Sequence, residues 1–241
     1  MLDRDDAFWQ GTAMTVPAMA DTAPDPIRPL PRPLAGLALL AIAALAVLLL
    51  GWLVARLPFA PDRAIVEGLR AWSGPRWLPR VAVDLTALGG GTVLTLVVVL
   101  VAGFLLAQRL WLTALMLAAA SWSGGQMVEI IKRIVARARP DLVEHLVPVH
   151  NASFPSGHAA GSAVVYLTLA ALASQVVPER AARRYLFGAA VLLTGAIGTS
   201  RVYLGVHWPS DVLAGWSFGT LWALGWWWAT ARTRAAIGGE R

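Results

Sequence analysis

Histidine, aspartate and arginine occur together in the stretch SRVYLGVHWPSD, between two long apolar segments of the chain. His207 and Asp211 stand four residues apart, so they can meet across one helical turn or a tight bend. An aspartate that accepts a hydrogen bond from one ring nitrogen fixes the tautomer and leaves the other nitrogen free as a base or nucleophile. Arg201 offers a fork of donors that matches phosphate oxygens. Taken alone, the stretch is equally typical of polar residues at a membrane edge.

A second stretch, SFPSGHAAGSA, has the pattern of a helix start. The first turn of a helix presents free backbone N–H groups and the positive end of the dipole, so it can bind an anion. Gly157 would let the anion approach the backbone closely. Ser156 adds a hydroxyl donor, and His158 stands in the first turn beside that anion. The plainer interpretation is a capped helix with an incidental histidine.

A third stretch, KRIVARARP, is rich in cations. If the preceding helix continues to Pro140, Lys132 and Arg139 are seven residues apart and lie on one face. Arg133 and Arg137 would form a separate pair, four residues apart. A basic anchor at the lipid headgroups is the alternative.

Together the three stretches supply fixed cations, neutral donors and two histidines, one able to attack and one able to donate a proton. This set suits a tetrahedral phosphate that is attacked on one side while a group leaves on the other. Phosphoryl transfer depends mostly on positioning and charge neutralisation, which cations can provide without a metal.

The composition indicates that these residues are carried by membrane helices. Of 241 residues, 57% are hydrophobic and only 14% are charged, whereas soluble domains carry about a quarter charged residues. The net charge of +6 suits anionic lipid or a phosphate site as well as nucleic acid, and we expect no nucleic-acid partner. The chain has no cysteine, which excludes disulfides, a thiolate zinc site and a cysteine nucleophile.

Six apolar segments are each long enough to cross a bilayer as a helix of roughly 18–22 residues. We therefore predict an all-α polytopic membrane protein with the active site at one membrane edge. Gly215 and Gly219 have the spacing of close helix contacts in membranes. The predicted spans lie near 34–55, 91–108, 110–131, 158–177, 185–204 and 211–230.

The remaining segments are predicted to flank this membrane domain of residues 34–230. Residues 1–33 are polar and proline-rich, which predicts a disordered cytoplasmic tail, and 231–241 form a short cytoplasmic tail. Between the first two spans, residues near 62–72 predict an amphipathic helix at the membrane surface. Its apolar face would consist of Ile65, Val66, Leu69 and Trp72.

Six crossings place both termini on one side of the membrane, but the positive-inside rule alone does not orient the chain. By our partition, ten of the twenty basic residues fall on each side. If the cations of the three stretches serve chemistry, they can be left out of the count. The basic residues that remain are then more numerous on the side of the termini, which favours termini in the cytoplasm. We therefore expect a multi-pass protein of the bacterial inner membrane, with its site facing the periplasm or exterior.

The three stretches also resemble the signature of the type 2 phosphatidic acid phosphatase superfamily, which includes lipid phosphate phosphatases and vanadium-dependent haloperoxidases. That signature is Lys, six residues, Arg-Pro; then Pro-Ser-Gly-His; then Ser-Arg, five residues, His, three residues, Asp. This chain has KRIVARARP, PSGH and SRVYLGVHWPSD, with no departure at any defined position. The resemblance covers residues 132–211 directly, and the six-helix layout extends it over about 34–230.

The resemblance implies a role for each matching residue. His207 would be the nucleophile that forms a phosphohistidine, and Asp211 would orient it. His158 would protonate the leaving oxygen and then activate the water that hydrolyses the intermediate. The family works without metal, so we expect no metal and no cofactor. The phosphate oxygens would be held by Lys132, Arg139, Ser156, Gly157 and Arg201.

The leading hypothesis is a metal-independent lipid phosphatase whose substrate is a phosphomonoester or pyrophosphate of a membrane lipid, with undecaprenyl pyrophosphate ranked first. Phosphatidylglycerol phosphate, phosphatidate and diacylglycerol pyrophosphate are alternative substrates, and a lipid phosphotransferase would use the same residues. A non-enzymatic membrane scaffold that binds phosphate is a further alternative.

Two other enzymes fit less well. A vanadium haloperoxidase shares the anion site, but those proteins are soluble and six spans argue against one. A metallohydrolase would have to draw its ligands from a set whose spacing matches no common metal motif, and three nearby cations would repel a divalent ion. That set is His145, His150, His158 and His207 with Asp141 or Asp211.

Overall fold

The structure is a computed structural model that describes residues 45–236, except 55, 57, 58 and 73. The predicted tail 1–33, the first part of the first predicted span and residues 237–241 lie outside the described residues. Within the described part of the chain every regular element is a helix and there is no strand, as predicted for an all-α protein.

Helices occupy each predicted span as far as it is described. In chain order they are an apolar helix Leu45–Val54, α2 Ala60–Trp72, α3 Leu78–Ala87, α4 Gly91–Ala107, α5 Trp111–Val135, α6 Gly157–Ser162, the π-helical turn η1 Ala163–Leu167, α7 Thr168–Val176, α8 Arg180–Tyr203 and α9 Pro209–Ala236.

Six membrane spans are not confirmed. In the described residues, two continuous helical stretches are long and apolar enough to cross a bilayer, Gly157–Ser174 and Arg180–Tyr203. A third is present if α3 and α4, which meet at an angle of 47°, count as one span. Helices α5 and α9 are long enough to cross a bilayer. Their Trp, Ser and Gly residues lower the mean hydropathy of both helices, which explains why neither counts as a span.

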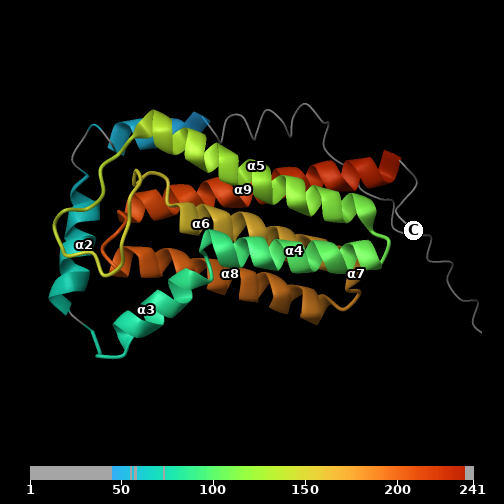
Figure 1. The fold of residues 1–241 in the computed structure, drawn as a ribbon, viewed down its shortest axis with the longest axis horizontal. Coiled ribbons are helices and arrows are strands. Elements are labelled where there is room, and N and C mark those ends of the chain that lie inside the picture. The colour runs from blue at the N-terminus through green and yellow to red at the C-terminus, as the bar shows by residue number, and fades with distance from the viewer. Residues whose placement is uncertain (1–44, 55, 57–58, 73, 237–241) are drawn as a thin grey trace, which may run out of the picture. The chain divides into compact units, whose positions relative to one another are not determined.

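The long helices lie side by side, and α2 lies across one end of them (Figure 1). Close contact between α9 and α6 depends on the two glycines whose spacing predicted it. A Cβ on Gly215 would lie 2.8 Å from the backbone oxygen of Ser156, and one on Gly219 would lie 2.6 Å from that of Ala160. The start of α6 and the start of α9 are thereby held together, which brings the second and third stretches to one place.

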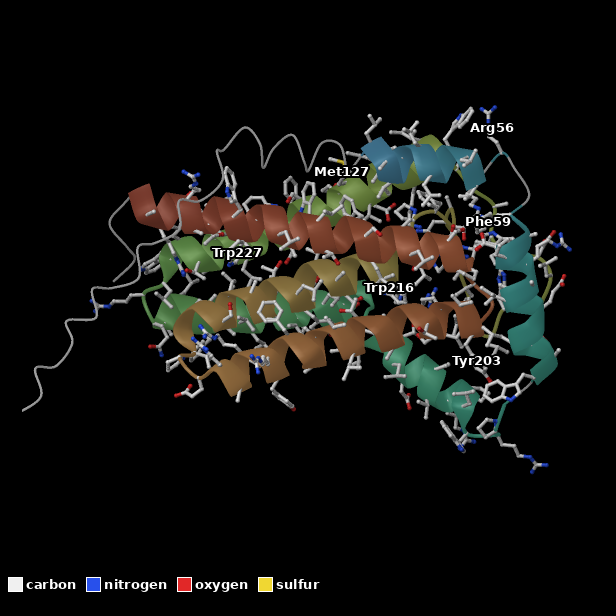
Figure 2. The ribbon with its side chains drawn as sticks, turned by 180° about the vertical axis from the view of Figure 1, so that it is seen from behind. Arg56, Phe59, Met127, Tyr203, Trp216 and Trp227 are labelled. Atoms are coloured by element: carbon white, nitrogen blue, oxygen red, sulfur yellow. The ribbon has the colours of Figure 1, made fainter. Side chains whose placement is uncertain are left out.

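Helix α8 joins the same bundle through Trp216 of α9 (Figure 2). The ring lies against Gly198, where a Cβ would be only 2.4 Å from it, and its Nε1 donates to the backbone oxygen of Thr194 at 3.0 Å. This contact fixes α8, which carries Arg201 at its last turn, against the helix that carries Asp211.

The prediction that the α5 helix continues to Pro140 is wrong. The helix ends at Val135, because Ala136 adopts the left-handed conformation (φ 47°) and its N–H caps the backbone oxygen of Lys132. Arg139 therefore lies in a loop and not on a helical face shared with Lys132. The predicted pair of Arg133 and Arg137 is also absent, because Arg133 is exposed and Arg137 is buried.

The amphipathic helix predicted near 62–72 is present as α2, but with a different buried face. Val66 and Leu69 pack on a core cluster, whereas Ile65 and Trp72 are exposed. The buried face also carries an acidic residue, Asp62, which is only 1% exposed. A buried carboxylate is costly unless it is paired, so its partners bear on the site.

Candidate active site

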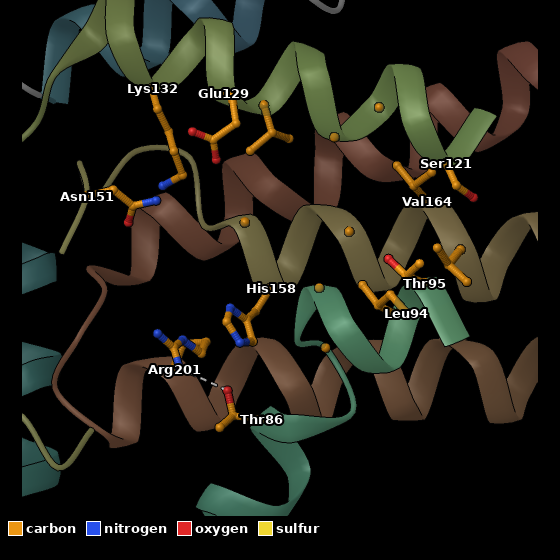
Figure 3. A pocket seen from close by; sticks show the side chains of 18 of the residues that line it. Thr86, Leu94, Thr95, Ser121, Glu129, Lys132, Asn151, His158, Val164 and Arg201 are labelled. Carbon is orange, nitrogen blue, oxygen red and sulfur yellow. Dashed lines mark hydrogen bonds between the residues drawn. The ribbon is translucent and has the colours of Figure 1, made fainter. Parts of the chain in front are cut away.

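A cavity of about 940 Å³ opens at the end of the bundle where the three stretches meet. Its wall includes six of the eight predicted site residues: Lys132, Arg139, Gly157, His158, Arg201 and His207. Figure 3 shows Lys132, His158 and Arg201 from three different helices around it. The other two, Ser156 and Asp211, are fully buried and do not line it.

The contacts of His207 determine which ring nitrogen is protonated. Nη1 of Arg139 lies 3.2 Å from Nε2 of His207. A guanidinium can only donate, so Nε2 is the accepting, unprotonated nitrogen and Nδ1 carries the hydrogen. Nδ1 in turn lies 3.4 Å from Oδ2 of Asp211. The lone pair of Nε2 is therefore directed toward the cations that line the cavity.

Asp211 is held by several donors from separate parts of the chain. Arg137 donates from Nη1 to Oδ1 at 2.6 Å. Oδ2 accepts from Oγ of Ser153 at 2.5 Å and from the backbone N–H of Trp208 at 3.0 Å. Ser153 Oγ also lies 3.3 Å from Nδ1 of His207. These contacts hold the carboxylate in place beside the imidazole.

The electrostatic surroundings keep His207 neutral. Burial lowers the pKa of His207 from 6.5 to about 3, and although Asp211 acts to raise it, Arg139 and Arg201 lower it further. The imidazole is therefore uncharged throughout the physiological pH range, and its lone pair is available for attack.

The cations of the cavity are anchored by backbone and side-chain acceptors. Lys132 Nζ donates to the backbone oxygen of Ala152 at 2.6 Å. Arg139 is held twice by Asn151, from Nε to the backbone oxygen at 2.8 Å and from Nη2 to Oδ1 at 2.7 Å. The segment before α6 thus positions two cations that come from the end of α5 and the loop after it.

Arg201 reaches the cavity from α8. Its Nη1 donates to Oγ1 of Thr86 at 3.1 Å, whereas its buried Nε has no hydrogen-bond partner in the described part of the chain. A buried donor without a partner costs about 1–3 kcal/mol. An anion bound in the cavity can supply the missing acceptor.

The start of α6 has the predicted form, with one difference. Ser156 is the N-cap, and its Oγ accepts from the backbone N–H of Ala159, so this hydroxyl caps the helix instead of lining the cavity. Gly157 lines it, and a Cβ there would meet nothing closer than 3.8 Å. The glycine therefore leaves room for an anion beside the first turn, with His158 next to it.

Several residues that complete this arrangement were missed from the sequence. Ser153 and Arg137 lie within the quoted stretches, but nothing in their spacing marked them as partners of Asp211. Asp62 had a usable signal, because it precedes Val66 by four residues and so falls on the buried face of α2. The remaining two, which hold cations, are Thr86 and Asn151.

Two of the four histidines considered for a metallohydrolase have other partners. Nε2 of His145 lies 2.7 Å from the backbone oxygen of Pro140, and His207 is paired with Asp211. Among the described residues, no group of three His, Cys, Asp or Glu side chains could hold a metal ion.

Comparisons with known proteins identify relatives of this chain. A family model described as the PAP2 superfamily matches residues 109–235. Phosphatidylglycerophosphatase B of Bacillus subtilis is 34% identical over 147 residues, which is 60% of this chain and 71% of that protein. A decaprenylphosphoryl-5-phosphoribose phosphatase of Mycobacterium tuberculosis is 32% identical over 115 residues, 46% of this chain and 56% of that protein.

The fold has a counterpart among solved structures. The crystal structure of a transmembrane PAP2-type phosphatidylglycerolphosphate phosphatase from Bacillus subtilis matches with a TM-score of 0.68 and 26% identity. The match covers 86% of this chain and 98% of that one.

Proposed function

Because the chain belongs to the PAP2 superfamily and is a lipid phosphatase, we propose that it hydrolyses a lipid phosphomonoester through a phosphohistidine on His207. The observation that carries this proposal is the contact between Arg139 Nη1 and His207 Nε2 at 3.2 Å. It assigns the lone pair to Nε2 and aims it at the group of cations where a phosphate would bind.

The proposed reaction has two steps. Nε2 of His207 attacks phosphorus while the bond to the lipid oxygen breaks, and His158 donates a proton to that oxygen. The lipid alcohol leaves, and the phosphoryl group remains on His207. A water then attacks phosphorus, His158 takes its proton, and inorganic phosphate is released. Lys132, Arg139 and Arg201 neutralise the charge on the phosphate oxygens in both steps.

The shape of the cavity suits a lipid substrate. From the cations it continues between α4, α5 and η1, where its wall is mostly apolar and includes Leu94, Val98, Val164 and Val165, with Thr95 and Ser121 as polar members. Figure 3 shows Leu94 and Val164 at the end of the cavity away from Lys132. A phosphate bound by the cations would therefore have its lipid portion against this apolar wall.

Glu129 supports a monoester over a pyrophosphate. It lies on α5 beside Lys132 and lines the cavity on the side toward the apolar wall (Figure 3). In the described residues its carboxylate has no hydrogen bond and no ion pair within 4 Å, although it interacts electrostatically with Lys132. The second phosphate of a lipid pyrophosphate lies between the attacked phosphate and the lipid, so it would bring negative charge toward Glu129. At a separation of about 8 Å and an effective dielectric of about 20, this repulsion costs on the order of 2 kcal/mol.

This argument changes the substrate ranking made from the sequence, where undecaprenyl pyrophosphate came first. The hydroxyl groups of a glycerol or a similar polyol next to the phosphate would meet Glu129 as hydrogen-bond donors. The 34% identity with phosphatidylglycerophosphatase B supports the same choice. We therefore propose phosphatidylglycerol phosphate, or another phosphomonoester of a polyol-containing lipid, as the substrate class.

The test compares kcat/KM of purified protein in detergent, with a chelator present, on phosphatidylglycerol phosphate, phosphatidate and undecaprenyl pyrophosphate. We expect phosphatidylglycerol phosphate to be preferred. Glu129→Gln should raise the ratio of kcat/KM for the pyrophosphate to kcat/KM for the monoester by roughly 30-fold, because about 1.4 kcal/mol corresponds to tenfold and the repulsion is about 2 kcal/mol.

The outcomes of this test are separable. No phosphate release by the wild type from any of the three lipids, or release only with added metal, contradicts the proposed function. If the wild type releases phosphate but prefers undecaprenyl pyrophosphate, and if Glu129→Gln leaves the ratio of the two kcat/KM values unchanged, only the proposed substrate class is contradicted. Glu67→Gln, an acid-to-amide change in an exposed residue of α2, is the matched control.

We also propose that the site faces the periplasm or exterior of a bacterial inner membrane and that both termini are cytoplasmic. Lys132, Arg137 and Arg201 form hydrogen bonds at the end of the bundle that holds the site. Their position has this separate reason, so they are not counted as evidence for the orientation of the chain in the membrane. The basic residues Arg180 and Arg184 stand at the start of α8, a helix of 24 residues. At about 1.5 Å per residue they lie roughly 30–35 Å from the end of α8 that reaches the site. The positive-inside rule then assigns the start of α8 to the cytoplasm.

Single-cysteine labelling tests this orientation, because the chain has no cysteine of its own. In intact cells, Asp141→Cys in the exposed loop after α5 should react with a membrane-impermeant maleimide, and Arg184→Cys should react only after lysis. The reverse pattern would overturn the proposed orientation.

A further inference from the structure

We propose that Asp62, on the surface helix α2, is a positioning residue for the nucleophile. It shares the buried Arg137 with Asp211 and so controls how firmly Asp211 holds His207. This inference rests on the proposed function. It adds to the site a residue that lies 70 positions before the first of the three stretches and that belongs to none of them.

The contacts of Asp62 are those of a fixed, charged group. The residue is 1% exposed. Its Oδ2 accepts from Nη2 of Arg137 at 2.8 Å and from the hydroxyl of Ser210, and its Oδ1 accepts from the backbone N–H of Ser210 at 2.9 Å. Ser210 directly precedes Asp211, so Asp62 holds both the backbone beside Asp211 and the cation that pairs with it.

The guanidinium of Arg137 lies between two carboxylates. Nη2 donates to Asp62 and Nη1 donates to Asp211 at 2.6 Å, and all three side chains are at least nine-tenths buried. One positive charge is thus shared by two negative charges, which leaves this group of three with a net negative charge on the Nδ1 side of His207. The imidazole becomes positively charged as Nε2 bonds to phosphorus, and this negative charge stabilises that change.

Removing the charge of Asp62 changes the net charge of the Asp62, Arg137 and Asp211 group without changing any residue proposed to bind the phosphate. Arg137 would then be neutralised by Asp211 alone, and less negative charge would remain to stabilise the charged imidazole. The N–H of Ser210 would also lose a charged acceptor, which loosens the first turn of α9. Neither change reaches the cations that bind phosphate, because Lys132, Arg139 and Arg201 are anchored by other residues.

A purely structural role is the competing explanation, in which Asp62 only fastens α2 to the bundle. That helix has a second attachment, since Nη2 of Arg70 donates to the backbone oxygen of Glu144 at 2.7 Å. The two roles differ in their kinetic consequences. Loss of attachment disturbs the whole site and lowers phosphate affinity and turnover together, whereas loss of positioning lowers turnover alone.

The experiment measures kcat, KM and the inhibition constant of inorganic phosphate for the purified full-length wild type, Asp62→Asn and Glu67→Gln. The control changes an acid to an amide on the same helix, at an exposed surface pair with Arg63. We expect kcat of Asp62→Asn to fall about 10- to 100-fold, the range for loss of one hydrogen bond to a charged group. KM and the phosphate inhibition constant should stay within about threefold, and Glu67→Gln should match the wild type.

Three results would overturn the inference: kcat of Asp62→Asn within twofold of the wild type, a parallel loss of kcat and phosphate affinity, or an equal effect of Glu67→Gln. If Asp62→Asn does not accumulate as folded protein, Ser210→Ala is used with the same criteria, because it removes one donor to Asp62 and leaves both charges. The substitution also removes the hydroxyl oxygen that accepts from Nη1 of Arg137 at 2.8 Å. Its kcat should fall about threefold or more, because both lost hydrogen bonds are to charged groups. A wild type without phosphatase activity would instead contradict the proposed function itself.

Discussion

Replacing His207 with alanine should abolish phosphate release, with kcat falling by roughly a thousandfold or more, the scale seen when a nucleophile is removed. The wild-type ring is neutral because burial lowers its pKa to about 3. Its Nε2 faces Arg139, and its Nδ1 faces Asp211. No other group on the cavity wall has a lone pair held this way, among the residues that the structure describes, so the variant would have no substitute nucleophile.

The measurement is phosphate release from phosphatidylglycerol phosphate by purified variant, compared with His145→Ala. His145 is a suitable control because it lies in the loop after α5 and does not line the cavity. The His207 variant should still be extracted from the membrane as folded protein and bind inorganic phosphate, since the three cations remain. Turnover within tenfold of the wild type would contradict the assignment of His207 as nucleophile.

Replacing His158 with alanine should reduce turnover of lipid substrates by about 10²–10⁴-fold, the usual contribution of a general acid or base. The side chain lines the cavity from the first turn of α6 and lies near Arg201 (Figure 3). In the described part of the chain no hydrogen bond engages its ring, so it is available to move a proton. The proposed mechanism uses it twice, once for the leaving oxygen and once for the attacking water.

This double use allows a sharper test with an aryl phosphate, whose leaving group needs no protonation. In His158→Ala the first step should then proceed at near the wild-type rate, while hydrolysis of the intermediate stays slow. A burst of aryl alcohol, equal to one per enzyme and followed by slow turnover, is the expected result. An equal loss on aryl and lipid substrates with no burst would contradict the role as acid and base, and His145→Ala should behave as wild type.

The sequence predicted the elements of this protein better than it predicted their contacts. The uncharged run of α4 and the helix start at Ser156 and Gly157 are set by residues close together in the chain, and the structure has both as predicted. The convergence of three stretches at one end of the bundle also follows from the sequence, because alternate loops of antiparallel helices meet at one end.

The missed features depend on residues that are distant in the sequence. Arg137 looked like a surface cation because helical spacing paired it with Arg133. The left-handed turn at Ala136 ends that helix and turns Arg137 toward the buried Asp62 and Asp211. Alanine rarely adopts this conformation, so local propensity gave no indication of the turn.

Ser156 illustrates a smaller limit. Its residue type suits either capping or phosphate binding, and only the fold shows that its hydroxyl accepts from Ala159. The count of six spans depended on apolar length alone, and tryptophan-rich or glycine-rich helices such as α5 and α9 are long without being uniformly apolar.

Trapping the phosphoenzyme tests the central claim of a phosphohistidine on His207 most directly. Wild-type protein and His158→Ala are mixed with radiolabelled aryl phosphate, stopped in alkaline denaturant, digested and mapped. The predicted result is label that is stable to alkali and labile to acid on the peptide containing His207, more abundant in His158→Ala and absent from His207→Ala. Label on a different residue, or His158→Ala showing a burst with no protein-bound label, would contradict it.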